Sequence, residues 1–255
     1  MQSEPASDLR DHRDWLASLV PIPVSGVWAD IGCGHGHDLL LAASKETSPE
    51  LRLVGIDSNE KAIEAAKNRS AMDDPRIEFS VRKLGGELPF DSDSLDVVFT
   101  NNLLECLQDR AAFVSEVARV LRPGGSVVAA HWDWDTQVFD STDKDLVRRL
   151  VAAFSDWTQP WMEHSDGWMG RRLWGAFESS GRFDGAVRAR VMTNTVFSEP
   201  WYGHARARNF ESLVRRGLVS RGDFDTFLHE QNELSAQEKY FYSITSYAYV
   251  GRRAA

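Results

Sequence analysis

The sequence predicts an α/β fold, a parallel sheet with helices on both faces. Apolar, strand-like segments alternate with amphipathic helical segments along the 255 residues. A glycine-rich turn follows the first strand and reads Asp30-Ile31-Gly32-Cys33-Gly34-His35-Gly36. The next strand ends in an acid, Asp57, about twenty residues after the glycines. Both features fall at the same edge of such a sheet, where they favour a nucleoside site but leave the reaction open.

Hydrophobic periodicity and punctuation residues predict each element in turn. Pro21 and Pro23 end the first helix, Ser58-Asn59 caps a later one, and Pro123-Gly124-Gly125 stops the helix before the fifth strand. The expected strands are 27–31, 51–57, 77–81, 95–100, 126–131, 188–197 and 240–250. The expected helices are 9–19, 37–44, 60–69, a segment around 113–121, 146–154 and 174–180, with a largely helical insertion over 199–237.

Composition excludes several classes of protein. The formal net charge of −9 argues against a general nucleic-acid binder, which needs clustered cations to displace counterions from phosphate. The two cysteines, Cys33 and Cys106, cannot form a disulfide framework, and no apolar run reaches the roughly eighteen residues of a membrane span. The first residues lack the basic and apolar regions of a secretory signal. We therefore expect a cytoplasmic protein without nucleic-acid or membrane partners.

Five motifs follow one another between residues 27 and 130. They are the glycine run 30–36, Gly55-Ile56-Asp57, Glu87-Leu88-Pro89-Phe90, Leu95-Asp96-Val97-Val98-Phe99 and Leu121-Arg122-Pro123-Gly124-Gly125. The last two do not belong to the fingerprint of nicotinamide dehydrogenases. In this order the motifs resemble the class I S-adenosylmethionine-dependent methyltransferases, especially bacterial stand-alone enzymes of the ubiquinone/menaquinone type (methyltransferase domain type 11).

The resemblance implies a Rossmann-like, seven-stranded, mostly parallel sheet with an antiparallel last strand. It also implies a single methyltransferase domain over 1–255, with an N-terminal helical lid at 1–24 and a cofactor-binding core at 25–135. Segments 136–185 and 199–238 would be insertions on the substrate side, forming a helical lid.

The implied cofactor is S-adenosylmethionine. Asp30 and the glycine run would flank its methionine moiety, and Asp57 would bind the ribose hydroxyls. The family often has an acid for the adenine amino group where this chain has Leu84, so backbone groups near Lys83 and Leu84 are expected there instead. The full set of expected cofactor residues is Asp30, Gly32, Cys33, Gly34, Gly36, Asp57, Ser58, Lys83, Leu84 and Asn101.

Residues after the fourth and fifth strands are the first candidates for chemistry, because ligands of open α/β sheets bind beyond the carboxyl ends of the strands. If the chain stays extended, His131, Asp133 and Asp135 share one side and Trp132 lies on the other. His131 is the candidate general base, with Asp133 to orient it. The alternative is that His131 and the two acids only cap the strand and form hydrogen bonds with loop amides. Predicted substrate-binding residues are Trp132, Asp135, Trp168 and Tyr202, and simple packing is the alternative for the aromatic ones.

The predicted reaction is direct in-line methyl transfer to a nitrogen, oxygen or carbon nucleophile of a small molecule. Two alternatives remain: a fold relative that uses the bound sulfonium for a non-methylating reaction, and a scaffold without turnover. Asn101-Asn102-Leu103 lacks the prolines typical of enzymes that methylate amino groups of nucleic acids. Cys33, His35 and His37 have metal-ligand chemistry, but no second cluster supports a metal site. A homodimer is left open.

Overall fold

A single sheet organises the chain, of which the computed structural model describes residues 7–69, 74–159, 162 and 164–254. Within these residues eight strands follow the order β3-β2-β1-β4-β5-β8-β6, and β7 pairs with the other side of β8. The strands are β1 (Gly26–Ile31), β2 (Leu51–Asp57), β3 (Ile77–Val81), β4 (Leu95–Asn101), β5 (Leu121–Trp132), β6 (Val138–Phe139), β7 (Phe183–Asn194) and β8 (Tyr242–Arg253).

The pairing confirms the predicted Rossmann-like sheet. β1 to β5 pair in parallel, and the last strand, β8, runs antiparallel to both β5 and β7. The described strands exceed the expected seven by β6, which has two residues. After β5 the chain makes a short 3-10 turn, η2 (Trp134–Thr136), and returns beside the start of β8, where Val138 pairs with Ser243.

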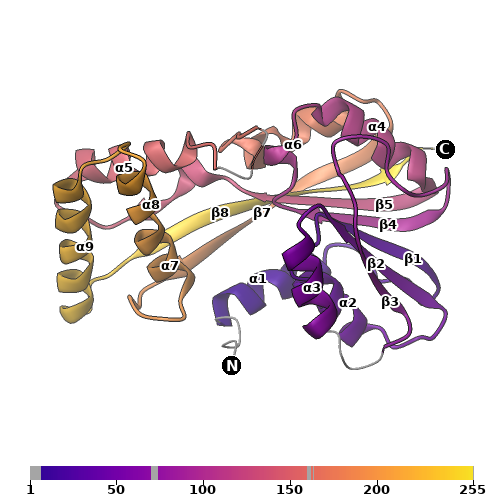
Figure 1. Cartoon of the computed structure of the whole chain (residues 1–255), viewed down its shortest axis with the longest axis horizontal. Helices are drawn as coiled ribbons and strands as arrows, with labels where there is room; N and C mark the ends of the chain where they lie inside the picture. The colour runs from indigo at the N-terminus through magenta and orange to yellow at the C-terminus, as the bar shows by residue number, and fades with distance from the viewer. Residues whose placement is uncertain (1–6, 70–73, 160–161, 163, 255) are drawn as a thin grey trace.

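Helices cover both faces of the parallel half of the sheet (Figure 1). One face carries α1 (Ser7–Ala17), α2 (His37–Lys45) and α3 (Glu60–Arg69), and the other carries α4 (Arg110–Val120) and α6 (Met169–Glu178). Successive residues of β5 pack alternately against the two helix layers. Val127 and Ala129 pack with α4 and α6, whereas Val128 and Ala130 pack with α1 and α2, as a strand with period two requires.

A third, aromatic core lies beyond the carboxyl end of β5. Four helices gather there around β6 and the start of β8, at the left of Figure 1: α5 (Lys144–Ser155), α7 (Tyr202–Asn209), α8 (Glu211–Arg215) and α9 (Arg221–Ala236). Phe139 meets Phe227 edge to face at 5.2 Å and lies 4.7 Å from Tyr242. The helical character expected of the insertion is thus confirmed. The division into lid, core and insertions stays a prediction, and residues 1–6 of the predicted lid lie outside the described residues.

Several boundaries differ from those expected. β5 begins directly after α4, because Leu121 is already extended and pairs with Leu95, and the register shifts before Ser126. The helix expected from residue 174 begins at Met169, preceded by Trp168, whose side chain makes no capping hydrogen bond. The strand expected at 188–197 spans Phe183–Asn194.

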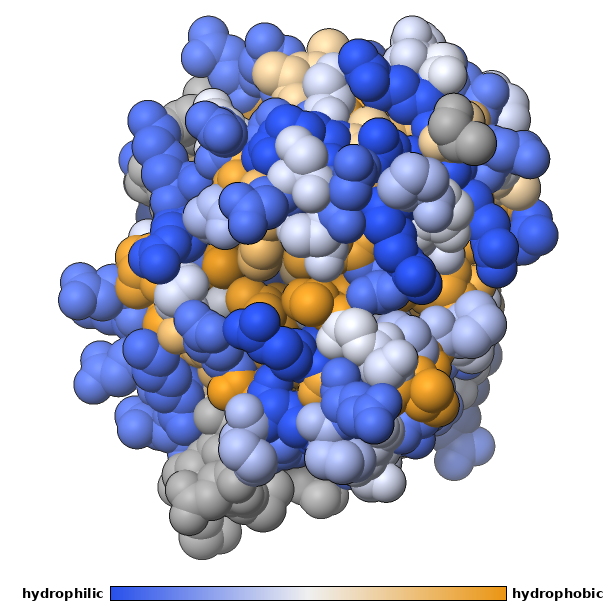
Figure 2. Space-filling view, turned by 90° about the vertical axis from the view of Figure 1, so that its right-hand side faces the viewer, coloured by the Kyte–Doolittle hydropathy of each residue, from blue (hydrophilic) through white to orange (hydrophobic). Residues whose placement is uncertain are grey.

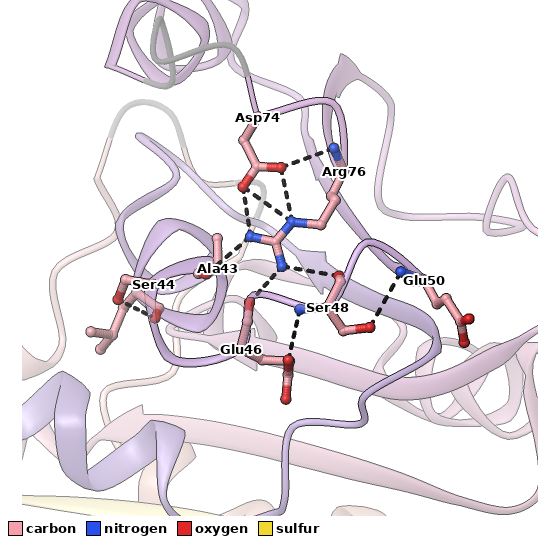
Figure 3. A network of polar contacts seen from close by, with 8 residues as sticks. Ala43, Ser44, Glu46, Ser48, Glu50, Asp74 and Arg76 are labelled. Carbon is pink, nitrogen blue, oxygen red and sulfur yellow. Dashed lines mark hydrogen bonds and ion pairs between the residues drawn. The ribbon is translucent and has the colours of Figure 1, made fainter.

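Arg76 stabilises the turn that leads into β2 through a network of hydrogen bonds (Figure 3). Its guanidinium donates to the backbone oxygens of Ala43 at 3.1 Å and Ser48 at 3.3 Å, and also to that of Glu46. Asp74 accepts from Nη2 at 2.6 Å and from Nε at 2.9 Å. This charge-assisted network joins the end of α2 to the approach to β3, and so helps to fix the start of the strand that carries Asp57.

Candidate functional site

The glycine loop joins β1 to α2. Gly32, Gly34 and Gly36 have φ angles of +78°, +50° and +74°, which side chains with a Cβ rarely adopt. A Cβ on Gly32 would lie 3.2 Å from Leu103, and one on Gly36 would lie 2.6 Å from Phe79. A Cβ on Gly34 would meet no atom of the described residues within 4 Å. Gly32 and Gly36 therefore allow close packing within the protein, whereas Gly34 faces open space.

Asp57 ties this loop to the next one. Its Oδ2 atom accepts a hydrogen bond from the Gly34 N–H at 2.8 Å, and its Oδ1 atom accepts one from the Asn59 N–H at 2.8 Å. Each carboxylate oxygen has a second lone pair. The acid at the end of β2 can therefore hold the loop and still accept hydrogen bonds from ligand hydroxyl groups.

A cavity of about 420 Å³ opens between these loops at the carboxyl ends of β1, β2 and β4. It is lined by six residues that the sequence predicted for the cofactor: Gly32, Gly34, Asp57, Ser58, Lys83 and Leu84. Its lining also includes His35 of the predicted glycine run, and Asn102 and Leu103 from the segment after the fourth strand that the sequence singled out for chemistry. Sequence reasoning missed the other five lining residues: Asn59, Ala62, Gly85, Cys106 and Leu107. Four predicted residues do not line the cavity: Asp30, Cys33, Gly36 and Asn101.

Asp30 is a buried acid with an unsatisfied oxygen. It is 2% exposed, and its Oδ2 atom has no hydrogen-bond partner among the described residues. Nearby, Asp38 accepts a hydrogen bond from the Asn101 amide at 3.2 Å and pairs with Arg13 of α1 at 3.4 Å. Burial raises the pKa of Asp30, and the charges of Asp38 and Asp57 raise it further. A ligand that brings an ammonium group fits this arrangement, because it would satisfy the free oxygen and favour the ionised carboxylate.

Replacing Asp30 with asparagine is expected to stabilise the ligand-free protein at neutral pH. A carboxyl group whose pKa is raised by folding does not lower the free energy of unfolding at pH values below the usual pKa of aspartate. As the pH rises above that value the free energy of unfolding falls, and the loss is complete above the raised pKa. Denaturant titrations across this range should therefore show a weaker decline of stability with pH in Asp30→Asn than in the wild type. Equal slopes would contradict the raised pKa.

His131 lies at the end of β5 and is completely buried. Its Nδ1–H donates to the Trp132 backbone oxygen at 2.7 Å, which leaves Nε2 as the atom that faces Oε1 of Glu105 at 3.7 Å. The other carboxyl oxygen of Glu105 accepts from the Trp134 indole at 2.8 Å. Burial raises the pKa of Glu105. Sequence reasoning did not single out Glu105, which comes from the 3-10 turn η1 (Leu104–Cys106) after β4.

Asp133 contacts Arg171 of α6 instead of His131. Its two carboxylate oxygens accept from Nε and Nη2 of Arg171, both at 2.6 Å. Asp135 lies 3.7 Å from the same guanidinium. The predicted orienting role of Asp133 therefore has no supporting contact, because the bidentate pair with Arg171 engages both oxygens.

Replacing Arg171 with leucine is expected to destabilise the protein by about 2 kcal/mol, because it leaves the fully buried Asp133 carboxylate without its cation. Urea unfolding of the two proteins measures the difference. The matched control is Arg148→Leu, since Arg148 pairs with Asp145 on the exposed surface of α5. Equal stability of the Arg171 variant and the wild type would contradict a structural role for this pair.

The predicted aromatic residues divide into two groups. Trp132 is buried between His12 of α1 and Tyr202 of α7, with ring centroids 4.2 and 5.2 Å away. Burial lowers the pKa of His12 to about 3, which keeps its ring neutral, and neither ring nitrogen has a hydrogen-bond partner in the described part of the chain. Trp168 is 42% exposed and stacks on Arg171 at the start of α6. The structure thus brings Trp132 and Tyr202 together, but not Trp168.

A second, larger cavity of about 640 Å³ lies along β2 and β3, from Arg52 and Glu78 to Ile56 and Arg82, beside the segment that leads into β4. Its wall mixes apolar residues such as Val27, Phe90 and Leu95 with charged ones such as Arg52 and Glu87. Figure 2, which views the molecule from the right of Figure 1, shows hydrophobic atoms between two polar bands. Ligands of doubly wound sheets bind at the carboxyl ends of the strands, so the cavity beside Asp57 is the better candidate despite its smaller size.

Comparison with known proteins identifies the family. The family model described as "Methyltransferase domain" matches residues 26–181, more than half of the chain. The 27-O-demethylrifamycin SV methyltransferase of Amycolatopsis mediterranei is 36% identical over 114 residues, which cover 44% of this chain and 40% of that protein. A trans-aconitate 2-methyltransferase of Azoarcus sp. is 34% identical over 116 residues, covering 46% and 42%. The chain thus matches less than half the length of either relative.

Solved structures share the fold. A putative methyltransferase from Bacillus halodurans superposes with a TM-score of 0.63 at 15% identity, covering 96% of this chain and 100% of that one. A phosphoethanolamine N-methyltransferase of Haemonchus contortus, solved with S-adenosyl-L-methionine, gives a TM-score of 0.58 at 16% identity and covers 96% and 53%.

The cavity between the glycine loop and Asp57 offers acceptors for the sugar hydroxyls of that methyl donor. The buried, unsatisfied carboxyl of Asp30 suits its ammonium group in charge, although Asp30 is not among the residues that line this cavity. The antiparallel last strand agrees with the same assignment. The ubiquinone-like subtype stays a prediction. By its sequence match and its sheet, this chain belongs to the methyltransferase domain family, and its cofactor is S-adenosylmethionine.

Proposed function

We propose that the protein methylates a small organic molecule at a nitrogen, oxygen or carbon atom. The observation that supports this most is the cavity beside Asp57, with the aromatic residues Trp132 and Tyr202 beyond the neighbouring strand end. The two curated relatives are named for 27-O-demethylrifamycin SV and for trans-aconitate, both small molecules.

When bound, S-adenosylmethionine supplies an electrophilic methyl group on a sulfonium. The chain's residues would then hold the donor and the acceptor in line, which provides most of the acceleration. Asp57 would accept hydrogen bonds from the ribose, Asp30 would pair with the ammonium group, and backbone groups near Lys83 and Leu84 would contact the adenine. Trp132 and Tyr202 would form a wall of the acceptor site.

His131 remains the candidate base. Its Nε2 atom has no hydrogen-bond partner among the described residues and lies 3.7 Å from Glu105, whose carboxyl we propose as its positioning partner in place of Asp133. The proton of the nucleophile would pass to Nε2, with the Nδ1–H fixed by the Trp132 carbonyl.

His131→Gln is expected to lower turnover about 100-fold and to change S-adenosylhomocysteine affinity less than about twofold, since the residue would act on the acceptor proton. Steady-state kinetics over a range of pH and calorimetry measure the two quantities. Normal turnover of the variant at every pH would remove His131 from the mechanism.

Two experiments test the proposed function. Calorimetry of the full chain with S-adenosylhomocysteine should show stoichiometric binding, and its absence from folded protein would contradict the cofactor site. Incubation of a metabolite pool with donor carrying a labelled methyl group should then yield labelled products. Product mass separates methyl transfer from both alternatives, because neither a non-methylating reaction nor a scaffold adds a methyl group.

The nature of the partners is also part of the proposal. In the described part of the chain, no helix combines the length and hydropathy that crossing a lipid bilayer takes. A small-molecule partner, a cytoplasmic location, a homodimer, and the lack of nucleic-acid or membrane partners all stay predictions.

A further inference from the structure

Arg206 lies on α7 one helical turn after Tyr202, facing the end of β5. Its guanidinium carbon is 4.7 Å from the Tyr202 ring centroid and 5.9 Å from that of Trp134. Tyr202 in turn stacks on Trp132, and the Trp134 indole donates to Glu105. Arg206 is therefore held by two aromatic faces beside the residues proposed for the acceptor site.

No described carboxylate pairs with Arg206. Its Nε atom is buried and has no hydrogen-bond partner among the residues that the structure describes. Its Nη2 atom donates to the Asn209 side-chain oxygen at 2.9 Å when that amide is oriented to satisfy both of its groups. Other partly buried arginines do have acids: Arg76 pairs with Asp74, Arg110 with Asp166, Arg119 with Glu116 and Arg171 with Asp133.

This difference has a chemical meaning. A buried guanidinium nitrogen without an acceptor loses the hydrogen bond that it would make with water, so the arrangement favours a ligand that supplies one. The planar N–H fork of arginine matches a carboxylate better than any neutral acceptor. The nearby Glu105 does not repel an anion when it is protonated, and its burial raises its pKa.

We propose that the acceptor substrate is a carboxylic acid and that Arg206 binds its carboxylate through the unpartnered Nε. This inference rests on the methyl-transfer function proposed above and names its substrate class. Trp132, Trp134 and Tyr202 then border the rest of the acceptor, so an acid with a flat or apolar body fits best.

Matched pairs of acids and amides test the inference. The full chain, saturated with S-adenosylhomocysteine, is titrated with benzoate and benzamide, with 4-hydroxybenzoate and 4-hydroxybenzamide, and with glutarate and glutaramide. Ligand-observed NMR and calorimetry measure the affinities. We expect the wild type to bind at least one acid about tenfold more tightly than its amide.

Arg206→Gln should abolish this preference and leave S-adenosylhomocysteine affinity and melting temperature unchanged. Arg208→Gln is the matched control, because Arg208 lies on the same helix but is exposed to solvent. The inference fails if the wild type shows no preference for acids, and also if it binds none of the six compounds. It fails as well if Arg206→Gln retains the preference. S-adenosylhomocysteine binding without acid preference would overturn this inference alone, whereas loss of that binding in the wild type would overturn the proposed function.

Discussion

Replacing Asp57 with alanine is expected to weaken S-adenosylhomocysteine binding by about 100-fold. The carboxylate accepts backbone hydrogen bonds from Gly34 and Asn59, both at 2.8 Å, and also lines the cavity. The variant therefore loses the anchor of the glycine loop together with the acceptors proposed for the ribose hydroxyls. Calorimetry on the full chain measures the change.

Two further variants separate these contributions. Asp57→Asn keeps one acceptor oxygen and should lose less affinity than Asp57→Ala. Asp145→Ala removes an exposed acid of α5 and should bind like the wild type. Wild-type affinity of Asp57→Ala would reject the proposed ribose contact, and a matching drop in melting temperature would show how much of any loss comes from the loop.

Much of the lining of the cavity proposed for the cofactor could be predicted, because its determinants are local in the sequence. Gly34 lies in a short loop directly after β1, and Asp57 is the last residue of β2, so the parallel pairing of these strands brings them together. Leu84 was also expected near the ligand and does line the cavity. The role of each residue in binding remains a proposal.

The acceptor half could not be predicted, because its contacts join distant positions. Period-two alternation placed His131 and Asp133 on one side of the chain, which agrees with their contacts to Glu105 and Arg171. It could not show that an arginine of α6 engages Asp133, or that a turn after β4 brings Glu105 to His131. Arg206 carries no local signal at all, since its position depends on how α7 packs against β5.

Fold errors have the same origin. The start of α6 was placed too late because Trp168, the residue before it, is not a capping residue type and makes no side-chain cap. Strand β6 has two residues, too few for a periodic signal, and exists only because β8 extends past β5.

Alanine at Gly34 is expected to weaken mainly ligand binding, whereas alanine at Gly36 is expected to lower mainly the stability of the fold. Gly34→Ala should fold with a penalty of about 1 kcal/mol, because its φ of +50° is unfavourable for alanine but its Cβ would meet no described atom within 4 Å. The added methyl group would stand at the cavity, so S-adenosylhomocysteine binding should fall at least about tenfold. Urea unfolding and calorimetry measure the two quantities.

Gly36→Ala should instead destabilise the protein by about 3 kcal/mol or more. Its φ of +74° is equally unfavourable, and the Cβ would lie 2.6 Å from the buried ring of Phe79, which must move. If Gly34→Ala bound the ligand normally, the loop would not approach it and the site would have to be placed elsewhere. If Gly36→Ala were as stable as the wild type, its glycine would not be a packing requirement. Both residues lie in the same loop and both are replaced with alanine. The comparison therefore separates a glycine that ligand binding requires from one that folding requires.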